Sequence, residues 1–186
     1  MAKLAYINNV SLDGYVEDPT GALDWAPPDE EVLAATTDLM RSFGTYLYGR
    51  RLYEAMAVWE TDPSIGAQSD LTAEFARVWG AADKVVYSRT LSSVPTARTQ
   101  LERRFDPEAV RRSKDAATSD LVIGGADLAG QAFGAGVLDD CHLLLWPMIL
   151  GGGKPALPAG GHVDLDLVDE RRFDNGVVHL HYAVRT

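Results

Sequence analysis

Three short apolar runs of this 186-residue chain are each followed by residues that bind anions. TYLYG is followed by two arginines, KVVYS by one arginine and DLVIG by a second glycine. The residues concerned are Gly49, Arg50, Arg51, Ser88, Arg89, Gly124 and Gly125. Arginine donates two parallel hydrogen bonds to a phosphate, and glycine lets an anion approach backbone N–H groups closely. If the three runs are neighbouring parallel strands, the pattern predicts one phosphate-binding crevice at their carboxyl ends.

Arg50 and Arg51 begin a helix predicted over residues 50–57, where positive charge opposes the helix dipole. A bound anion would remove this conflict. The alternative is that one of the two arginines, Arg51 in particular, is a solvated surface charge. Ser88 and Arg89, taken by themselves, fit a surface turn equally well.

Gly124 and Gly125 separate a buried strand from a helical pattern that includes Ala126 and Leu128. Free N–H groups at the start of that helix would donate to a pyrophosphate brought close to the glycines. Asp127 would repel a phosphate placed too near, which moves the expected contact to the Gly125 and Ala126 amides. Tight packing of the helix against the strand is the alternative explanation.

A long loop over residues 11–25, directly after the first predicted strand, carries the candidate substrate-side residues. Asp13 supplies a carboxylate, Gly14 supplies mobility, and Tyr15 and Trp25 could cover a flat heterocycle. Long loops in compact domains are often lids. The alternative is a solvated surface loop whose aromatic side chains pack on the edge of the domain.

Other chemical signatures fail on inspection. In LGGGKPA, Met148 and Pro155 stand where a phosphate-binding Walker loop needs glycine and serine or threonine, and no GxGxxG motif follows a strand. His179 and His181 share one face of a strand but have no third ligand nearby, so we predict no metal site. The net charge of −10 opposes binding to nucleic acid or an anionic membrane, which leaves a small molecule as the expected partner.

Periodicity predicts alternating strands and helices, which is typical of a mixed sheet covered by helices on both faces. Strands are predicted at residues 3–10, 45–49, 84–88, 120–124, 141–150, 162–173 and 176–184. Helices are predicted at residues 27–43, 50–57, 71–82, 106–115 and 126–136, and residues 89–100 are predicted as a loop. We expect one domain, residues 1–186, with a sheet that is parallel in its first half and ends in an antiparallel C-terminal hairpin.

The single cysteine, Cys141, cannot form an internal disulfide and fits a reducing cytoplasm. The N-terminus lacks the unbroken apolar run of a signal peptide. No segment approaches the roughly 18 successive apolar residues of a transmembrane helix. We therefore expect a cytoplasmic protein.

Six motifs, in order along nearly the whole chain, resemble the dihydrofolate reductase fold family, and within it the reductase domain of the bacterial bifunctional riboflavin-biosynthesis deaminase-reductase. They are SLDGYV, YGRRLYE, VVYSRTL, IGGADLAGQAF, PMILGGGKP and FDNGVVHLHY. The resemblance implies a dihydrofolate reductase-like three-layer α/β/α fold and NADPH as hydride donor. No deaminase segment with zinc ligands accompanies these motifs, which leaves the physiological substrate open.

The resemblance also implies roles for the residues named above. Arg50, with Arg51 assisting, and Ser88 with Arg89 would hold the 2′-phosphate of NADPH beside Gly49. Gly124, Gly125 and the amides of Ala126 and Leu128 would carry the pyrophosphate. Gly151 and Gly152 would lie near the nicotinamide. Asp13 is the preferred substrate-side and catalytic residue, within a substrate site that also contains Gly14, Tyr15 and Trp25.

The resulting hypothesis is an NADPH-dependent reductase of a pteridine-like or aminouracil-ribosyl-phosphate-like heterocycle, as in folate or riboflavin metabolism. A second carboxylate could come from Asp29, Glu30 or Glu31, early in the first helix, although all three also fit solvent-facing acids that favour the helix dipole. The alternatives are a non-catalytic nucleotide-binding module and a structural protein that uses the fold only to dimerise. The resemblance implies a homodimer.

Overall fold

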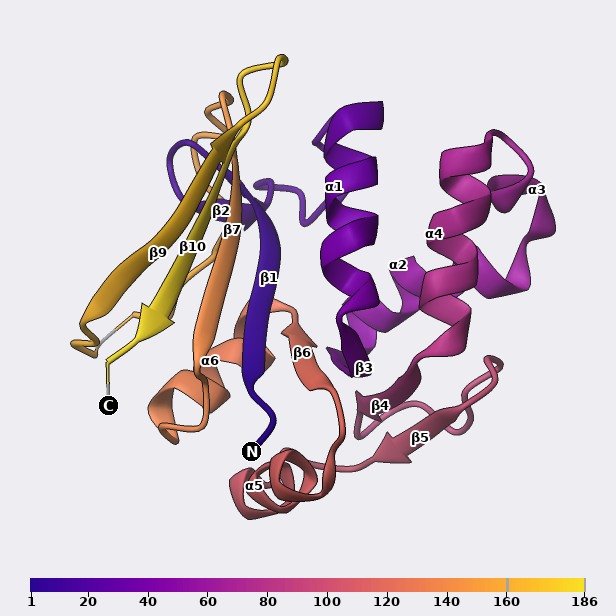
Figure 1. Cartoon of the computed structure of the whole chain (residues 1–186), viewed down its shortest axis with the longest axis vertical. Helices are drawn as coiled ribbons and strands as arrows, with labels where there is room; N and C mark the ends of the chain where they lie inside the picture. The colour runs from indigo at the N-terminus through magenta and orange to yellow at the C-terminus, as the bar shows by residue number, and fades with distance from the viewer. Residues whose placement is uncertain (160, 186) are drawn as a thin grey trace.

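A computed structural model of the chain describes residues 1–159 and 161–185, and its centre is one eight-stranded sheet (Figure 1). The strands are β1 (Leu4–Ser11), β3 (Phe43–Gly49), β4 (Asp83–Tyr87), β5 (Thr99–Glu102), β6 (Asp120–Gly124), β7 (Asp140–Trp146), β9 (Leu165–Arg172) and β10 (Val178–Val184). Their order is β5-β4-β3-β6-β1-β7-β10-β9, and every neighbouring pair is parallel except the two that involve β10. The predicted mixed sheet with an antiparallel C-terminal hairpin is confirmed.

Helices cover both faces of this sheet, as Figure 1 shows. They are α1 (Glu30–Arg41), α2 (Arg50–Thr61), α3 (Pro63–Gly66), α4 (Asp70–Ala81), α5 (Pro107–Ala116) and α6 (Ala126–Gly134). Successive side chains of a strand point to opposite faces. Accordingly, Ala5 packs in the cluster beneath α1, α2 and α4, whereas Leu4 and Tyr6 pack beneath α5 and α6. The predicted three-layer arrangement follows from this alternation.

Two helices that follow neighbouring strands begin without a side-chain cap. α2 starts after Gly49 at the end of β3, and α6 starts after Gly125 at the end of β6. By contrast, the Asp29 carboxylate caps α1 by accepting from the Val32 amide at 2.9 Å. Because the first N–H groups of a helix lack intrahelical partners, α2 and α6 present free donors at the same edge of the sheet.

A two-stranded sheet ties the loop after β1 to the glycine-rich segment after β7. β2 (Tyr15–Glu17) pairs antiparallel with β8 (Lys154–Pro155). An added Cβ on Gly153 would meet the Glu17 carbonyl oxygen at 1.9 Å, so this glycine is required by the close approach of the two segments. The arrangement carries Glu17 and Lys154 to the edge of the main sheet where α2 and α6 begin.

The structure corrects three predicted boundaries. β7 stops at Trp146 instead of continuing to residue 150, because Pro147 has no N–H for the ladder. β5 was not predicted, since its sequence TQLE has only one apolar residue to signal a strand; it begins at Thr99, near the end of the loop predicted over residues 89–100, and continues to Glu102. α1 begins at Glu30, after the two prolines that were predicted to start it. No helix in the described part of the chain is long and apolar enough to cross a membrane.

Candidate functional site

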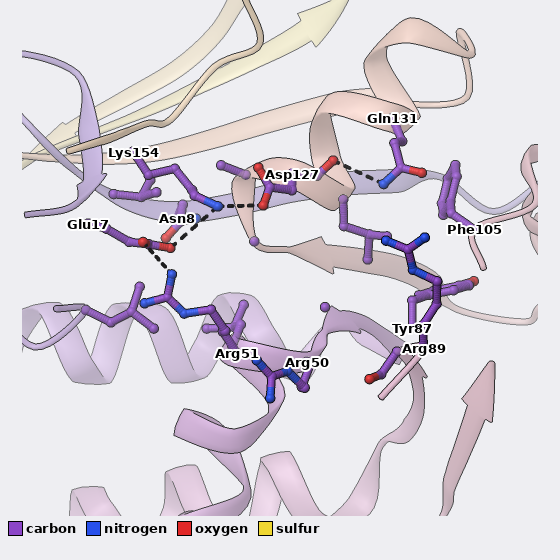
Figure 2. A pocket seen from close by; sticks show the side chains of 18 of the residues that line it. Asn8, Glu17, Arg50, Arg51, Tyr87, Arg89, Phe105, Asp127, Gln131 and Lys154 are labelled. Atoms are coloured by element: carbon purple, nitrogen blue, oxygen red, sulfur yellow. Dashed lines mark hydrogen bonds and ion pairs between the residues drawn. The ribbon is translucent and has the colours of Figure 1, made fainter. Parts of the chain in front are cut away.

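A cavity of about 580 Å³ lies where β3, β4 and β6 end and where α2 and α6 begin (Figure 2). We call it the arginine-lined cavity, because five arginines face it: Arg50, Arg51, Arg89, Arg103 and Arg104. Lys154 brings the cationic side chains to six, against the two carboxylates of Glu17 and Asp127. The lining therefore carries four more positive than negative charges in a protein whose net charge is −10, and of these cations Arg50 also pairs with Glu54 at 3.8 Å.

The turn after β4 presents Arg89 to this cavity. The buried Ser88 hydroxyl accepts from the Thr90 amide at 3.2 Å and from the Leu91 amide at 3.0 Å, which fixes the turn. The Arg103 guanidinium donates to the Ser88 and Leu91 carbonyl oxygens at 3.2 and 2.6 Å. Ser88 and Arg103 Nη1 therefore fix the shape of the loop, and the Arg89 guanidinium is the part of the turn that is left to meet a ligand.

Aromatic rings form a wall beside Arg89. Tyr87 and Phe105 meet edge to face with their centroids 5.5 Å apart, and Figure 2 shows both rings next to the Arg89 side chain. A flat base stacks favourably on such rings and on guanidinium planes. This end of the cavity can thus take a phosphate together with an aromatic group.

At the opposite end of the cavity, each carboxylate has its own cation. Arg51 donates to the Glu17 carboxylate at 2.7 Å and to the Gly21 carbonyl oxygen at 2.6 Å. Lys154 contacts Asp127 at 2.5 Å, and Figure 2 shows it bridging Asp127 and Glu17. Lys154 thus neutralises the repulsion between Asp127 and an anion at the start of α6. Arg51, in turn, anchors the loop after β1.

The two consecutive glycines after β6 are required for different reasons. An added Cβ on Gly124 would meet Leu52 Cδ2 at 2.4 Å and the Tyr48 ring at 3.0 Å, so this position lets α2 pack against the sheet. Gly125 has open space around its Cα but a φ of +91°, a conformation that L side chains rarely adopt. Close packing thus explains Gly124, and backbone conformation explains Gly125.

A second cavity of about 840 Å³ lies between the sheet and helices α1, α2 and α4. We call it the apolar cavity, because its walls are mostly aliphatic and aromatic; they include Ile7, Leu33, Met56, Trp59, Phe75 and Trp146. Asn8 and Leu52 line both cavities, so the two cavities lie next to each other, and together we call them the cleft. The Asn8 side-chain amide donates to the Tyr6 hydroxyl at 3.2 Å, which orients it at the junction.

Two of the three candidate carboxylates on α1 line the apolar cavity. They are Asp29, which is partly buried, and Glu30, which is exposed. Glu31 accepts from Arg171 at 2.9 Å and from the Asp174 amide at 3.0 Å, and these bonds lower the pKa of its carboxyl group. Glu31 therefore belongs to the contact between α1 and the C-terminal hairpin.

The structure divides the residues predicted for the site into three groups. Those that line the arginine-lined cavity are Gly49, Arg50, Arg51, Ser88, Arg89, Gly125, Ala126 and Leu128, and Gly124 lines the apolar cavity. Those that line neither cavity are Asp13, Gly14, Tyr15, Trp25, Gly151 and Gly152. The predicted cofactor residues after the three strands are thus brought together, whereas the predicted substrate-side loop residues are not.

Asp13 holds the loop after β1 against the segment after β7. Its carboxylate accepts from Ser11 Oγ at 2.6 Å and from the Leu150 and Gly151 amides at 3.1 and 2.8 Å. The Ser11 hydrogen bond is the main cause of a lowered pKa for this carboxyl, which keeps it ionised at neutral pH. Trp25 also has a structural contact, since its indole N–H donates to the Val16 carbonyl oxygen at 2.9 Å. This placement gives no support to substrate contact by either residue.

Several cavity residues escaped the sequence reasoning. Arg103, Arg104 and Phe105 follow β5, a strand that was not predicted, so nothing in the sequence indicated that they lie at the edge of the sheet. Lys154 lies in LGGGKPA, the segment that does not match a Walker loop. Asn8 lies within β1, where the alternation of apolar and polar residues indicates only a polar position. β5 pairs with β4, the strand that contains KVVY. Had this strand been predicted, Arg103, Arg104 and Phe105 would have been placed at the carboxyl edge of the sheet.

Histidines on β7 and β10 form a separate cluster. His142 Nδ1 lies 3.1 Å from His179 Nε2, and the His142 ring stacks on His181 with centroids 3.9 Å apart. Among the described residues, no three histidine, cysteine, aspartate or glutamate side chains are arranged to hold a metal ion. Burial raises the pKa of the neighbouring Cys141 thiol to about 12, so this cysteine is unreactive at neutral pH.

Comparisons with known proteins identify the family and the fold of the chain. The family model described as the RibD C-terminal domain matches residues 2–179. The YyaP protein of Bacillus subtilis (strain 168), itself uncharacterised, is 27% identical over 174 residues, which are 93% of this chain and 90% of YyaP.

Two solved structures share the fold. A protein of Shewanella sp. PV-4, provisionally assigned to riboflavin biosynthesis, aligns over 100% of both chains with a TM-score of 0.78 and 19% identity. The diaminohydroxyphosphoribosylaminopyrimidine deaminase/5-amino-6-(5-phosphoribosylamino)uracil reductase of Thermotoga maritima aligns with a TM-score of 0.67 and 12% identity. That match covers 99% of this chain and 57% of the Thermotoga chain.

Proposed function

The chain belongs to the family of RibD C-terminal domains, and from this premise we propose that it is an NADPH-dependent reductase of a small heterocyclic compound. The observation that carries the proposal is the arginine-lined cavity. It joins guanidinium groups to two uncapped helix N-termini, and this donor set suits a ligand with several phosphates. The likeness in fold to a 5-amino-6-(5-phosphoribosylamino)uracil reductase supports this reaction class.

The residues that line the cleft fit each part of NADPH in turn. Arg50 and Arg89, with Arg103 and Arg104 beside them, would hold the 2′-phosphate, and the Tyr87 and Phe105 rings would pack against the adenine. The amides after Gly125 would donate to the pyrophosphate, since α6 has no side-chain cap there. The junction at Asn8, where the two cavities meet, would then receive the nicotinamide.

NADPH would supply the hydride, and the chain would position the acceptor. One N–H of the Asn8 side chain donates to the Tyr6 hydroxyl. Its second N–H and its carbonyl oxygen can bond to NADPH or to the acceptor. The walls of the apolar cavity exclude water from the acceptor, and Asp29 can accept from an N–H of the ring. Asp13 acts as a positioning residue, because it holds the loop that carries Glu17 to the cleft.

A non-catalytic NADPH-binding module is the second reading. The apolar cavity favours the reductase, because a module that only bound the nucleotide would not need 840 Å³ of apolar space joined to the cofactor site. Incubation with NADPH and a panel that includes dihydrofolate and the aminouracil ribosyl phosphate separates the two. Oxidation of NADPH supports the reductase, and tight binding without turnover across the panel supports the module.

The arginine assignment predicts a selective loss in an Arg89→Ala variant. Charge-assisted hydrogen bonds contribute about 1.5–3 kcal/mol each, so the dissociation constant for NADPH should rise about 10- to 100-fold. The constant for NADH, which lacks the 2′-phosphate, should stay unchanged. Both are measured by fluorescence titration.

Arg77→Ala is the matched control. Arg77 is exposed and pairs with Glu74 on α4, outside both cavities. It should leave both dissociation constants as they are. Equal weakening of NADPH and NADH by Arg89→Ala would contradict the assignment of Arg89 to the 2′-phosphate.

A further inference from the structure

The two halves of the cleft differ in charge. The arginine-lined cavity has six cationic side chains. The apolar cavity, although it is larger, is lined by no lysine, arginine or histidine among the residues that the structure describes. Its charged groups are the carboxylates of Asp29 and Glu30. Any ionic preference of the apolar cavity is therefore against anions.

The charged side chains of the apolar cavity, Asp29 and Glu30, are carboxylates that can only accept hydrogen bonds when ionised. Asp29 Oδ1 is fixed by the Val32 amide at 2.9 Å, and this bond directs the half-buried carboxylate at the start of α1. Asn9 Oδ1 accepts from the Trp146 indole at 2.9 Å, which fixes that ring in the wall. A donor N–H on a ligand therefore meets a carboxylate at the rim, while its ring faces indole, phenyl and thioether groups.

A phosphate group would be poorly tolerated in the same space. It would lose hydration against apolar walls, gain no arginine or lysine partner and lie near two carboxylates. Like charges placed side by side disfavour a ligand by several kcal/mol, which corresponds to on the order of 100-fold in affinity. The arginines of the other cavity are engaged by the cofactor when the protein functions as proposed.

We propose that the apolar cavity selects an uncharged, flat ring compound with N–H donors, and that it rejects a substrate carrying a phosphate. This inference rests on the proposed function, because it takes the arginine-lined cavity as the cofactor site. The proposed substrate therefore differs from the phosphoribosyl compound after which the Thermotoga enzyme is named, because it carries no phosphate.

A matched pair of probes tests the proposal: 2-naphthol, which is uncharged at neutral pH, and 2-naphthyl phosphate. Binding is followed by quenching of Trp59 and Trp146, which line the apolar cavity, with saturating NADP⁺ filling the arginine-lined one. We expect 2-naphthol to bind on the order of 100-fold more tightly than its phosphate. Equal or tighter binding of the phosphate overturns the proposal.

A Thr36→Lys variant tests the same cause by gain of binding. Thr36 lines the apolar cavity from α1, so a lysine there supplies the missing cation. The affinity for 2-naphthyl phosphate should rise about 10-fold or more, while that for 2-naphthol should not rise. Asp38→Asn is the control, because it makes the same change in net charge on the exposed side of α1.

Binding of the cofactor is measured separately from binding of the two naphthyl compounds. A separate titration with NADP⁺ alone tests the proposed function, and absence of binding contradicts that function. The substrate class is judged only by the ratio of the two naphthyl affinities at the tryptophans of the apolar cavity. A ratio near one with normal NADP⁺ binding overturns the substrate class alone.

Discussion

Gly124 and Gly125 show how adjacent identical residues serve different requirements. The first is required by the Leu52 side chain on α2, and the second by a φ of +91° at the start of α6. Both positions are predictable from sequence as special, since a glycine pair between a strand and a helix signals either close packing or an anion site. The sequence does not show which requirement applies to which glycine, because this depends on α2 packing over β6, a contact between residues far apart in the chain.

This difference predicts different rescue behaviour. Gly124→Ala should lower the free energy of unfolding by about 1–3 kcal/mol through overpacking, and the loss should shrink in a Leu52→Ala background. Gly125→Ala should cost about 1–2 kcal/mol through its positive φ and should show no such rescue. Urea unfolding of the single and double variants measures both. Additive effects of Gly124→Ala and Leu52→Ala would contradict the packing explanation.

At the scale of elements, the sequence revealed the strands that alternate or are continuously apolar, and it missed β5. TQLE carries no pattern, and it forms a strand only because β4 offers an open edge on which to pair. The loss of β5 concealed Arg103 and Arg104, two of the five arginines of the site. Arg50 and Arg89 were found because they follow strongly apolar strands.

The pairing of β7 with β10 predicts an acid-sensitive sheet. Burial, and to a smaller extent the charges of His181 and His179, lower the pKa of His142 to about 3. The pKa of a histidine in an unfolded chain is about 6.5. Below that pH the unfolded chain binds a proton that the folded chain excludes. The free energy of unfolding should therefore fall by up to about 1.4 kcal/mol per pH unit as the pH drops from about 6.5 toward 4.

Urea unfolding at several pH values measures this slope. A His142→Gln variant should show a shallower slope, because the group that titrates only on unfolding has been removed. His162→Gln is the control, since the His162 side chain is 89% exposed. An unchanged slope in His142→Gln would assign the acid sensitivity to other groups.

At the scale of the whole molecule, the expected homodimer has a plausible surface in β9. Within the residues that the structure describes, β10 is the only strand paired with β9, and Leu167 and Val168 of β9 are 54% and 55% exposed. Open edges and exposed apolar side chains favour association. We expect sedimentation at twice the chain mass of 20.2 kDa, and a shift toward monomer in Leu167→Glu.

Leu12→Glu serves as the control for that experiment. Leu12 is 59% exposed but lies in the loop after β1 and is not part of β9. It should leave the sedimentation unchanged. A native chain that sediments as a monomer at micromolar concentration would contradict the dimer.

The cleft as a whole joins a cationic cavity to an apolar one at Asn8. The sequence predicted the cationic half from local signals, because each strand end carries its own arginine or glycine. The apolar half is assembled from α1, α2, α3, α4 and four strands, β1, β3, β6 and β7, so no local sequence pattern marked it. The substrate-side residues were therefore sought in the loop over residues 11–25, where Asp13 has a structural contact instead.

The central claim is that the arginine-lined cavity binds NADPH through its 2′-phosphate. The most direct measurement is the pair of dissociation constants of the native chain for NADPH and NADH, determined by fluorescence titration under identical salt. We expect NADPH to bind about 10- to 100-fold more tightly than NADH, since its 2′-phosphate adds at least one charge-assisted contact. Equal constants for the two cofactors, or no binding of either, would contradict it.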